Sequence, residues 1–162
     1  ESGADIVKVG IGQGSPCTTK DKTGFTMPMF SCVKWCSDVT LDDGNRVQII
    51  ADGGIKCNGD IAKSLVAGAS MAMAGGVFAA CTDSPALNMN INGSIRKAYY
   101  GSASAENKGH NNHIEGKLNS VESNNMSLEK KLFEIKQDLQ SSISYGGGSN
   151  IDIFKEVDYH YV

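Results

Sequence analysis

Three short apolar runs, each followed by glycines, constrain the fold of this chain more than any other feature. Residues 4–11 read ADIVKVGI, residues 47–51 read VQIIA and residues 71–74 read MAMA. Helical patterns follow these runs at 30–39, 58–68 and 77–81. Strands that are apolar throughout, alternating with helices, are typical of parallel sheets that helices cover. We therefore predict an α/β fold with buried strands, and we expect Asn58 to cap the second helix.

The glycines follow the strands in pairs, as Gly53-Gly54 and Gly75-Gly76. In a (β/α)8 TIM barrel the active site lies at the carboxyl ends of the strands, and the last two loops often hold a phosphate. Spacing alone leaves open whether these glycines bind phosphate or only form tight turns with positive φ. A complete barrel needs about 250 residues, whereas this chain has 162. We expect it to be the C-terminal part of such a barrel, with the missing units before Glu1.

The character of the sequence changes after the third unit. Alternation around Asn92-Gly93 predicts a β-hairpin over 88–100. The polar stretch 101–125 predicts a mobile flap, inserted after the last strand. Apolar residues at helical spacing predict a final helix over about 127–142. The expected organisation is one partial domain, 1–162, made of three βα units (1–83), a hairpin and active-site flap (84–126), and a helix with a tail (127–162).

Composition and charge exclude several classes of function. A net charge of −3 argues against a nucleic-acid partner. No run approaches the roughly 20 apolar residues of a membrane span. Five scattered cysteines and no secretory leader predict reduced thiols in the cytoplasm. Cys32 and Cys36 lie one helical turn apart, but no nearby histidine completes a zinc site.

Cys17 stands in the loop GQGSPCTT, residues 12–19. A lone cysteine is most often a small buried apolar residue. This one follows a strand in a glycine-rich loop, where barrel enzymes place their chemistry and where a thiolate can act as a nucleophile.

The loop GQGSPCTTK (12–20), the run IADGG (50–54) and the later Gly75-Gly76 together resemble the IMP dehydrogenase/GMP reductase family. The resemblance covers essentially the whole chain and implies a TIM barrel in which Cys17 bonds to C2 of a purine nucleotide. It also implies a set of nucleotide-binding positions. These are Ser15, Asp52, Gly53, Gly54, Gly75, Gly76, Tyr100, Gly101 and Ser102.

Two features resemble the reductase branch of the family. Cys17 is followed by Thr18-Thr19 where dehydrogenases usually read Ile-Thr, and the flap reads Glu115-Gly116-Lys117 where dehydrogenases carry Gln-Gly. By itself Glu115 would be a solvated surface charge. The resemblance implies that Thr19 and Glu115 relay a proton, so that GMP and NADPH give IMP and ammonia in purine salvage.

The resemblance further implies a homotetramer that binds GMP or IMP and NADPH, with K⁺ on the carbonyls of Gly12, Gly14 and Cys17. We expect the chain alone to be inactive, because its barrel is open. Other readings remain: an IMP dehydrogenase, an inactive remnant or regulatory fragment of the family, and a flavin-binding barrel that uses the glycines for a phosphate.

Overall fold

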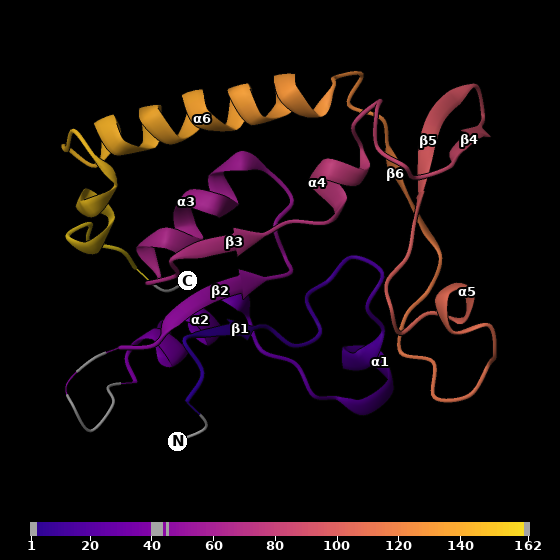
Figure 1. Cartoon of the computed structure of the whole chain (residues 1–162), viewed down its shortest axis with the longest axis horizontal. Helices are drawn as coiled ribbons and strands as arrows, with labels where there is room; N and C mark the ends of the chain where they lie inside the picture. Colours follow the sequence, from indigo (N-terminus) through magenta and orange to yellow (C-terminus); the bar gives the residue numbers. More distant parts are fainter. Residues whose placement is uncertain (1–2, 40–43, 45, 161–162) are drawn as a thin grey trace.

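The computed structural model describes residues 3–39, 44 and 46–160. Figure 1 shows a parallel sheet with its helices beside a separate antiparallel sheet. The strands are β1 (Ile6–Val9), β2 (Gln48–Asp52), β3 (Met71–Met73), β4 (Asn88–Ile91), β5 (Ser94–Tyr99) and β6 (Asn119–Glu122). The helices are α1 (Thr19–Thr23), α2 (Met29–Ser37), α3 (Asn58–Val66), α4 (Gly76–Ala79), α5 (Ala105–Lys108), α6 (Leu128–Tyr145) and the 3₁₀ turn η1 (Ile151–Lys155).

The first three strands form a parallel sheet in the order β1-β2-β3, as the sequence predicts. Val7 pairs with Ile49, and Ile50 pairs with Met71. Helix α2 buries Val33 against the central strand, where Ile49 and Ala51 are also buried. The α/β fold and the parallel strands are therefore confirmed.

The prediction that 4–11 forms a buried strand is wrong in one respect. Ile6 and Val7 are 42% and 39% exposed, and Met71 and Met73 on the opposite edge are each 45% exposed. The reason is that β1 and β3 are both edge strands among the described residues, so each has a neighbour on one side only. An exposed apolar edge of this kind is prone to pair with further strands.

The second sheet is antiparallel, in the order β4-β5-β6. The predicted hairpin is confirmed: Asn92 and Gly93 have φ values of 53° and 84°, the positive pair that a two-residue turn of type I′ requires. The stretch 101–125, predicted as a flap, contains the regular elements α5 and β6. β6 pairs with β5 along its whole length, and Arg96 donates from β5 to the hydroxyl of Ser120 at 2.8 Å.

Helix α6 lies across α3, as Figure 1 shows. Asn58 joins the two helices, because its amide donates to Glu134 at 3.2 Å and to Asp138 at 2.6 Å. The prediction that Asn58 is the N-cap of α3 is wrong, because Asn58 is the first residue of the helix itself. Cys57 is the N-cap, and Asp60 accepts the backbone N–H of Cys57 at 3.1 Å.

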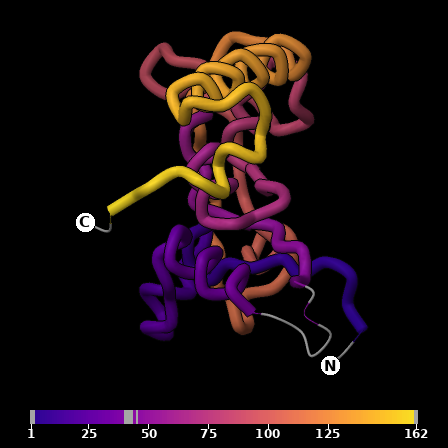
Figure 2. The backbone as a smooth tube through the Cα atoms, turned by 90° about the vertical axis from the view of Figure 1, so that its left-hand side faces the viewer, coloured from indigo at the N-terminus to yellow at the C-terminus, as the bar shows by residue number. Residues whose placement is uncertain are grey.

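The chain turns back after α6, as Figure 2 shows. Helix α6 runs one turn beyond the predicted end and is capped by Gly146, and η1 buries Phe154. The ring of Tyr159 contacts that of Phe30, with their centroids 4.8 Å apart. The last two positions of the predicted tail, 161–162, lie outside the described residues.

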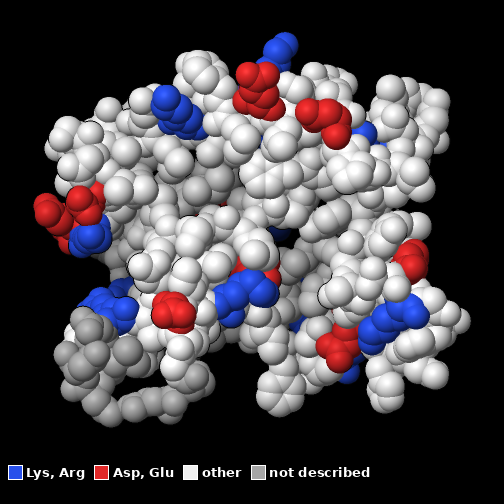
Figure 3. Space-filling view, viewed as in Figure 1, with Lys and Arg blue, Asp and Glu red and all other residues white. Residues whose placement is uncertain are grey.

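Charged side chains of both signs are interspersed on the face in Figure 3, and most of that face is uncharged. Such a surface agrees with the small net charge of −3. In the described part of the chain, none of the helices has the length and apolar character needed to cross a bilayer.

Candidate active site

A cavity of about 480 Å³ lies where β1 and β2 end. Its walls come from the loop after β1, from the end of β2, from β5 and from the segment between β5 and β6. The residues that line it include Gly12, Gly14, Cys17, Thr19, Asp52, Gly53, Tyr99, Gly101, Ser102, Lys108, His113 and Glu115. The loop after β1 and the predicted flap, far apart in sequence, thus form one site.

Three of the predicted residues form a chain of hydrogen bonds in this cavity. The thiol of Cys17 donates to the Thr19 hydroxyl at 3.3 Å, and that hydroxyl donates to a carboxylate oxygen of Glu115 at 2.6 Å. All three side chains are half-buried. A thiol, a hydroxyl and a carboxylate in series can move a proton from sulfur to carboxylate, because the hydroxyl is both donor and acceptor.

The backbone holds Glu115 in this position. The carbonyl of Glu115 accepts the N–H of Thr18 at 2.9 Å, and its own N–H donates to Ala103 at 3.1 Å. Next to it, Gly116 forms a β-bridge with Cys17. The flap segment is therefore attached to the cysteine loop at Glu115 and Gly116.

Two lysines bind the carbonyls that precede Glu115. Lys22 of α1 donates to the carbonyl of Ile114, and Lys108 of α5 donates to that of His113 at 2.7 Å. Because Thr19 belongs to the same short helix as Lys22, α1 contacts two consecutive flap residues with one face.

Asp52 ends β2 and lines the cavity, where it forms an ion pair with Lys8 of β1. The turn that follows brings Gly53, with φ 97°, close to the cysteine loop. A Cβ on Gly53 would lie 3.1 Å from the backbone nitrogen of Gly14. This glycine is required by both its φ and the close approach of the two loops.

Sequence reasoning missed Tyr99, which lines the same cavity as Cys17 and Asp52. Burial, together with the negative charge of Asp52, raises the pKa of Tyr99. Its hydroxyl lies against Gly75, where a Cβ would come within 1.9 Å of the oxygen. Strand alternation gave no signal for it, because Lys97, two residues before on the same side of β5, is a residue type that indicates solvent, although it is only 3% exposed.

The structure separates the other predicted nucleotide-binding residues. Ser15 and Gly76 line a neighbouring cavity of about 320 Å³. Gly54 borders a smaller one of about 160 Å³. Tyr100 lines a third cavity, of about 560 Å³, which Tyr99 also borders.

No group of three metal-binding side chains occurs within the ranges that the structure describes. Burial raises the pKa of Cys32, and the neighbouring Cys36 raises it further. Both effects disfavour the thiolate form of Cys32 that would ligate zinc. The loop after β1 is different in kind, because it offers backbone carbonyls, the ligands that hard cations such as K⁺ prefer. One of these, on Gly14, accepts the N–H of Cys17 at 2.9 Å and keeps a second lone pair.

Comparison with known proteins decides the family. The model of the IMP dehydrogenase / GMP reductase domain matches residues 1–161. The chain belongs to this family. A GMP reductase from Streptococcus pyogenes is 47% identical over 160 residues, which are 98% of this chain and 47% of the relative. One from Mesoplasma florum is 45% identical over 159 residues, 97% of this chain and 48% of the relative.

The family's solved structures include a similar fold. A cysteine-to-alanine variant of GMP reductase from Trypanosoma brucei, in complex with guanosine 5′-monophosphate, superposes with a TM-score of 0.83 at 30% identity. The match covers 95% of this chain and 33% of that one. The chain thus spans about half the length of the curated relatives it matches.

Proposed function

We propose that this chain is the C-terminal part of a GMP reductase, which converts GMP and NADPH to IMP, ammonia and NADP⁺. The observation that carries the proposal is the hydrogen-bonded series from Cys17 through Thr19 to Glu115. The names of the relatives, and the GMP bound to the solved structure, support the same substrate.

In the first step the Cys17 sulfur attacks C2 of GMP and forms a carbon–sulfur bond. The bond from C2 to the amino nitrogen then breaks. Thr19 and Glu115 pass the thiol proton to that nitrogen, so the two hydrogens of the amino group and this proton leave as ammonia. The product of the step is a thioimidate on Cys17.

In the second step C2 of the thioimidate is reduced. NADPH, when bound, supplies a hydride. The carbon–sulfur bond breaks, its electron pair returns to the Cys17 sulfur, and IMP is released. Lys108 and His113, in the wall beside Cys17, are suitable for holding the negatively charged dinucleotide.

Around the purine, we assign Asp52 to the ribose hydroxyls and Gly53, Gly101 and Ser102 to the wall of the nucleotide cavity, which they line. Ser15, Gly54, Gly75 and Gly76 are assigned to the phosphate end, where small residues let it approach the backbone. The carbonyls of Gly12, Gly14 and Cys17 would hold K⁺. This ion takes no part in the proton transfer.

We also propose that β1 and β3 pair with further strands of a TIM barrel. The support is their exposed apolar residues, such as Val7 and Met71, on both edges of the parallel sheet. Residues 1–162 alone should then lack activity. A cooperative thermal transition together with GMP turnover by the isolated chain would contradict this. A homotetramer acting in cytoplasmic purine salvage, as the resemblance implies, completes the proposal.

The test uses the full-length protein that contains this chain. It should oxidise NADPH when GMP is added, and Cys17→Ala should abolish turnover while GMP still binds. Preferential oxidation of IMP with NAD⁺ would instead identify a dehydrogenase. Turnover near the wild-type rate in Cys17→Ala would refute the covalent mechanism.

A further inference from the structure

The cavity of about 320 Å³ beside the Cys17 site is lined by residues from the cysteine loop, α4 and α6. Ser15 lines it from the loop after β1, and Gly76 lines it from the start of α4. It adjoins the larger cavity, because neighbouring residues of the same loops line the two: Gly14 lines one and Ser15 the other. A nucleotide with its base at Cys17 can therefore extend its phosphate toward this second cavity.

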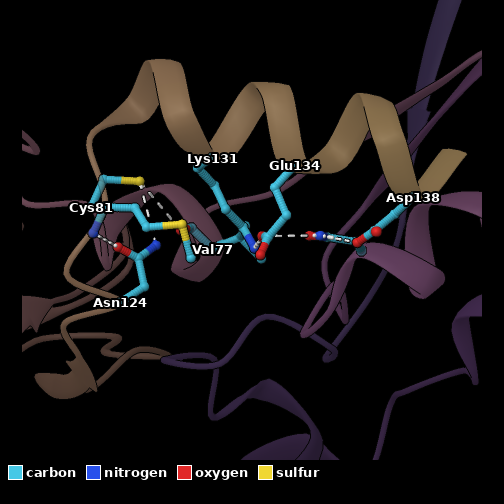
Figure 4. Close-up of polar contacts among 8 residues, drawn as sticks. Val77, Cys81, Asn124, Lys131, Glu134 and Asp138 are labelled. Atoms are coloured by element: carbon cyan, nitrogen blue, oxygen red, sulfur yellow. Dashed lines mark hydrogen bonds and ion pairs between the residues drawn. The ribbon is translucent and has the colours of Figure 1, made fainter.

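Lys131 of α6 supplies a cation to the wall of this cavity. Its side chain is only 14% exposed, and its ammonium forms an ion pair with Glu134, one turn further along the helix. Figure 4 shows both side chains projecting from the same face of α6. An ammonium has three donors, and Glu134 accepts one of them.

Glu134 is itself held in place from the other side. The amide of Asn58 donates to it at 3.2 Å and to Asp138 at 2.6 Å. Hydrogen bonds from Lys131 and Asn58 keep the pKa of Glu134 below its usual value. The carboxylate therefore stays ionised and orients the lysine at neutral pH.

We propose that Lys131 binds the phosphate of the nucleotide substrate. This inference rests on the proposed function, since it places the purine of GMP against Cys17. A phosphate monoester carries nearly two negative charges, and a lysine is suited to it as a point charge. Because its side chain is largely buried, Lys131 acts in a medium that screens charge less than water does.

Lys56 also lines this cavity, but Lys56 is exposed to solvent. An exposed ammonium interacts weakly, because water and salt screen it. We therefore assign the charge recognition to Lys131. The sequence offered no signal for it, because a lysine on an amphipathic helix is ordinarily a solvated charge.

The test measures dissociation constants for GMP and for guanosine by calorimetry on the full-length protein. Lys131→Met keeps the aliphatic stem and removes the charge. It should weaken the binding of GMP about 10- to 100-fold, the usual loss for a hydrogen bond to a charged group. The dissociation constant for guanosine should stay unchanged. Lys131→Gln gives a second, polar replacement with the same expected result, and Lys131→Arg should restore most of the GMP affinity.

Two control variants separate charge recognition from helix stability. Lys130→Met removes a neighbouring exposed lysine of α6 and should leave both constants unchanged. Glu134→Gln removes the carboxylate that orients the ammonium but keeps the cation, so GMP affinity should fall by less than in Lys131→Met.

The inference is overturned if Lys131→Met and Lys131→Gln bind GMP as the wild type does. It is equally overturned if they lose affinity for GMP and for guanosine by the same factor. It is also overturned if only the KM for NADPH rises, since the lysine would then serve the dinucleotide. Failure of the wild type to bind GMP overturns the proposed function itself, and so differs from a failure confined to the variants.

Discussion

The hydroxyl of Thr19 donates a 2.6 Å hydrogen bond to Glu115, a residue 96 positions later in the chain. Thr19 begins helix α1, which follows the first strand, and Glu115 lies in the segment that joins the two last strands of the antiparallel sheet. Their contact connects the two sheets at the point where Cys17 lies. The proposed proton path therefore depends on long-range packing as well as on residue type.

We expect Glu115→Gln to slow GMP deamination by about 10²- to 10⁴-fold, the usual effect of losing a positioned proton-transfer group. A glutamine can accept the Thr19 hydrogen bond but cannot carry the proton. Hydride transfer from bound IMP to NADP⁺ needs no ammonia and should fall much less. Rapid-mixing kinetics in both directions measures the two steps, and an equal fall in both would mean that Glu115 only orders the flap.

Lys22 should act as a positioning residue, because it binds the carbonyl of Ile114 from the same helix that carries Thr19. Lys22→Met should lower kcat up to about 10²-fold, since small displacements of a catalytic group have effects of this size. KM for GMP should change little, and Lys22→Arg should recover activity.

Lys20→Met, on the same helix and exposed, is the matched control for Lys22 and should be nearly silent. Equal losses in Lys20→Met and Lys22→Met would attribute the effect to helix stability. A rise in KM with unchanged kcat would assign Lys22 to substrate binding.

The order of strands and helices followed from the sequence because each depends on local pattern. The hairpin at Asn92-Gly93 needs only two residues with positive φ. β6 escaped notice because its sequence, NSVE, has little apolar alternation. Pairing with β5 makes it a strand, and that contact is not visible locally.

The candidate site was predictable only in part. The glycine-rich loop after a strand pointed to Cys17, whereas Thr19 and Glu115 follow only from the resemblance to a family; the structure brings all three into one cavity. The resemblance points to Tyr100, whereas the residue that lines the Cys17 cavity is its neighbour Tyr99. Lys131 carried no sequence signal, since its proposed phosphate contact depends on how α6 packs beside the loops that bear Ser15 and Gly76.

Gly75 and Gly76 offer a matched pair for testing how closely the loops pack. A Cβ on Gly75 would lie 1.9 Å from the Tyr99 hydroxyl, whereas one on Gly76 would meet nothing closer than 3.8 Å. Gly75→Ala should therefore destabilise the full-length protein by about 1–3 kcal/mol, the usual effect of overpacking, and displace Tyr99. Gly76→Ala should unfold like the wild type. Denaturant titration of both variants is the measurement, and equal stabilities would show that Tyr99 moves without cost.

Asp60 should make the stability of the protein depend on acid pH. Burial acts to raise the pKa of Asp60. Hydrogen bonds from the backbone N–H groups of Lys56 and Cys57, together with the Cys57 thiol and the charge of Lys63, outweigh burial and hold the pKa below its usual value. A carboxyl with a lowered pKa stabilises the fold above its unfolded pKa of about 3.9, and loses that contribution as pH falls through the folded pKa.

Asp60→Ala should thus lower the free energy of unfolding by about 0.5–2 kcal/mol at neutral pH, as loss of a helix cap does. The difference from the wild type should shrink as the pH falls below 4. Urea titrations of the full-length protein across that range measure it, and a difference that stays constant with pH would show that the side chain stabilises α3 without its charge.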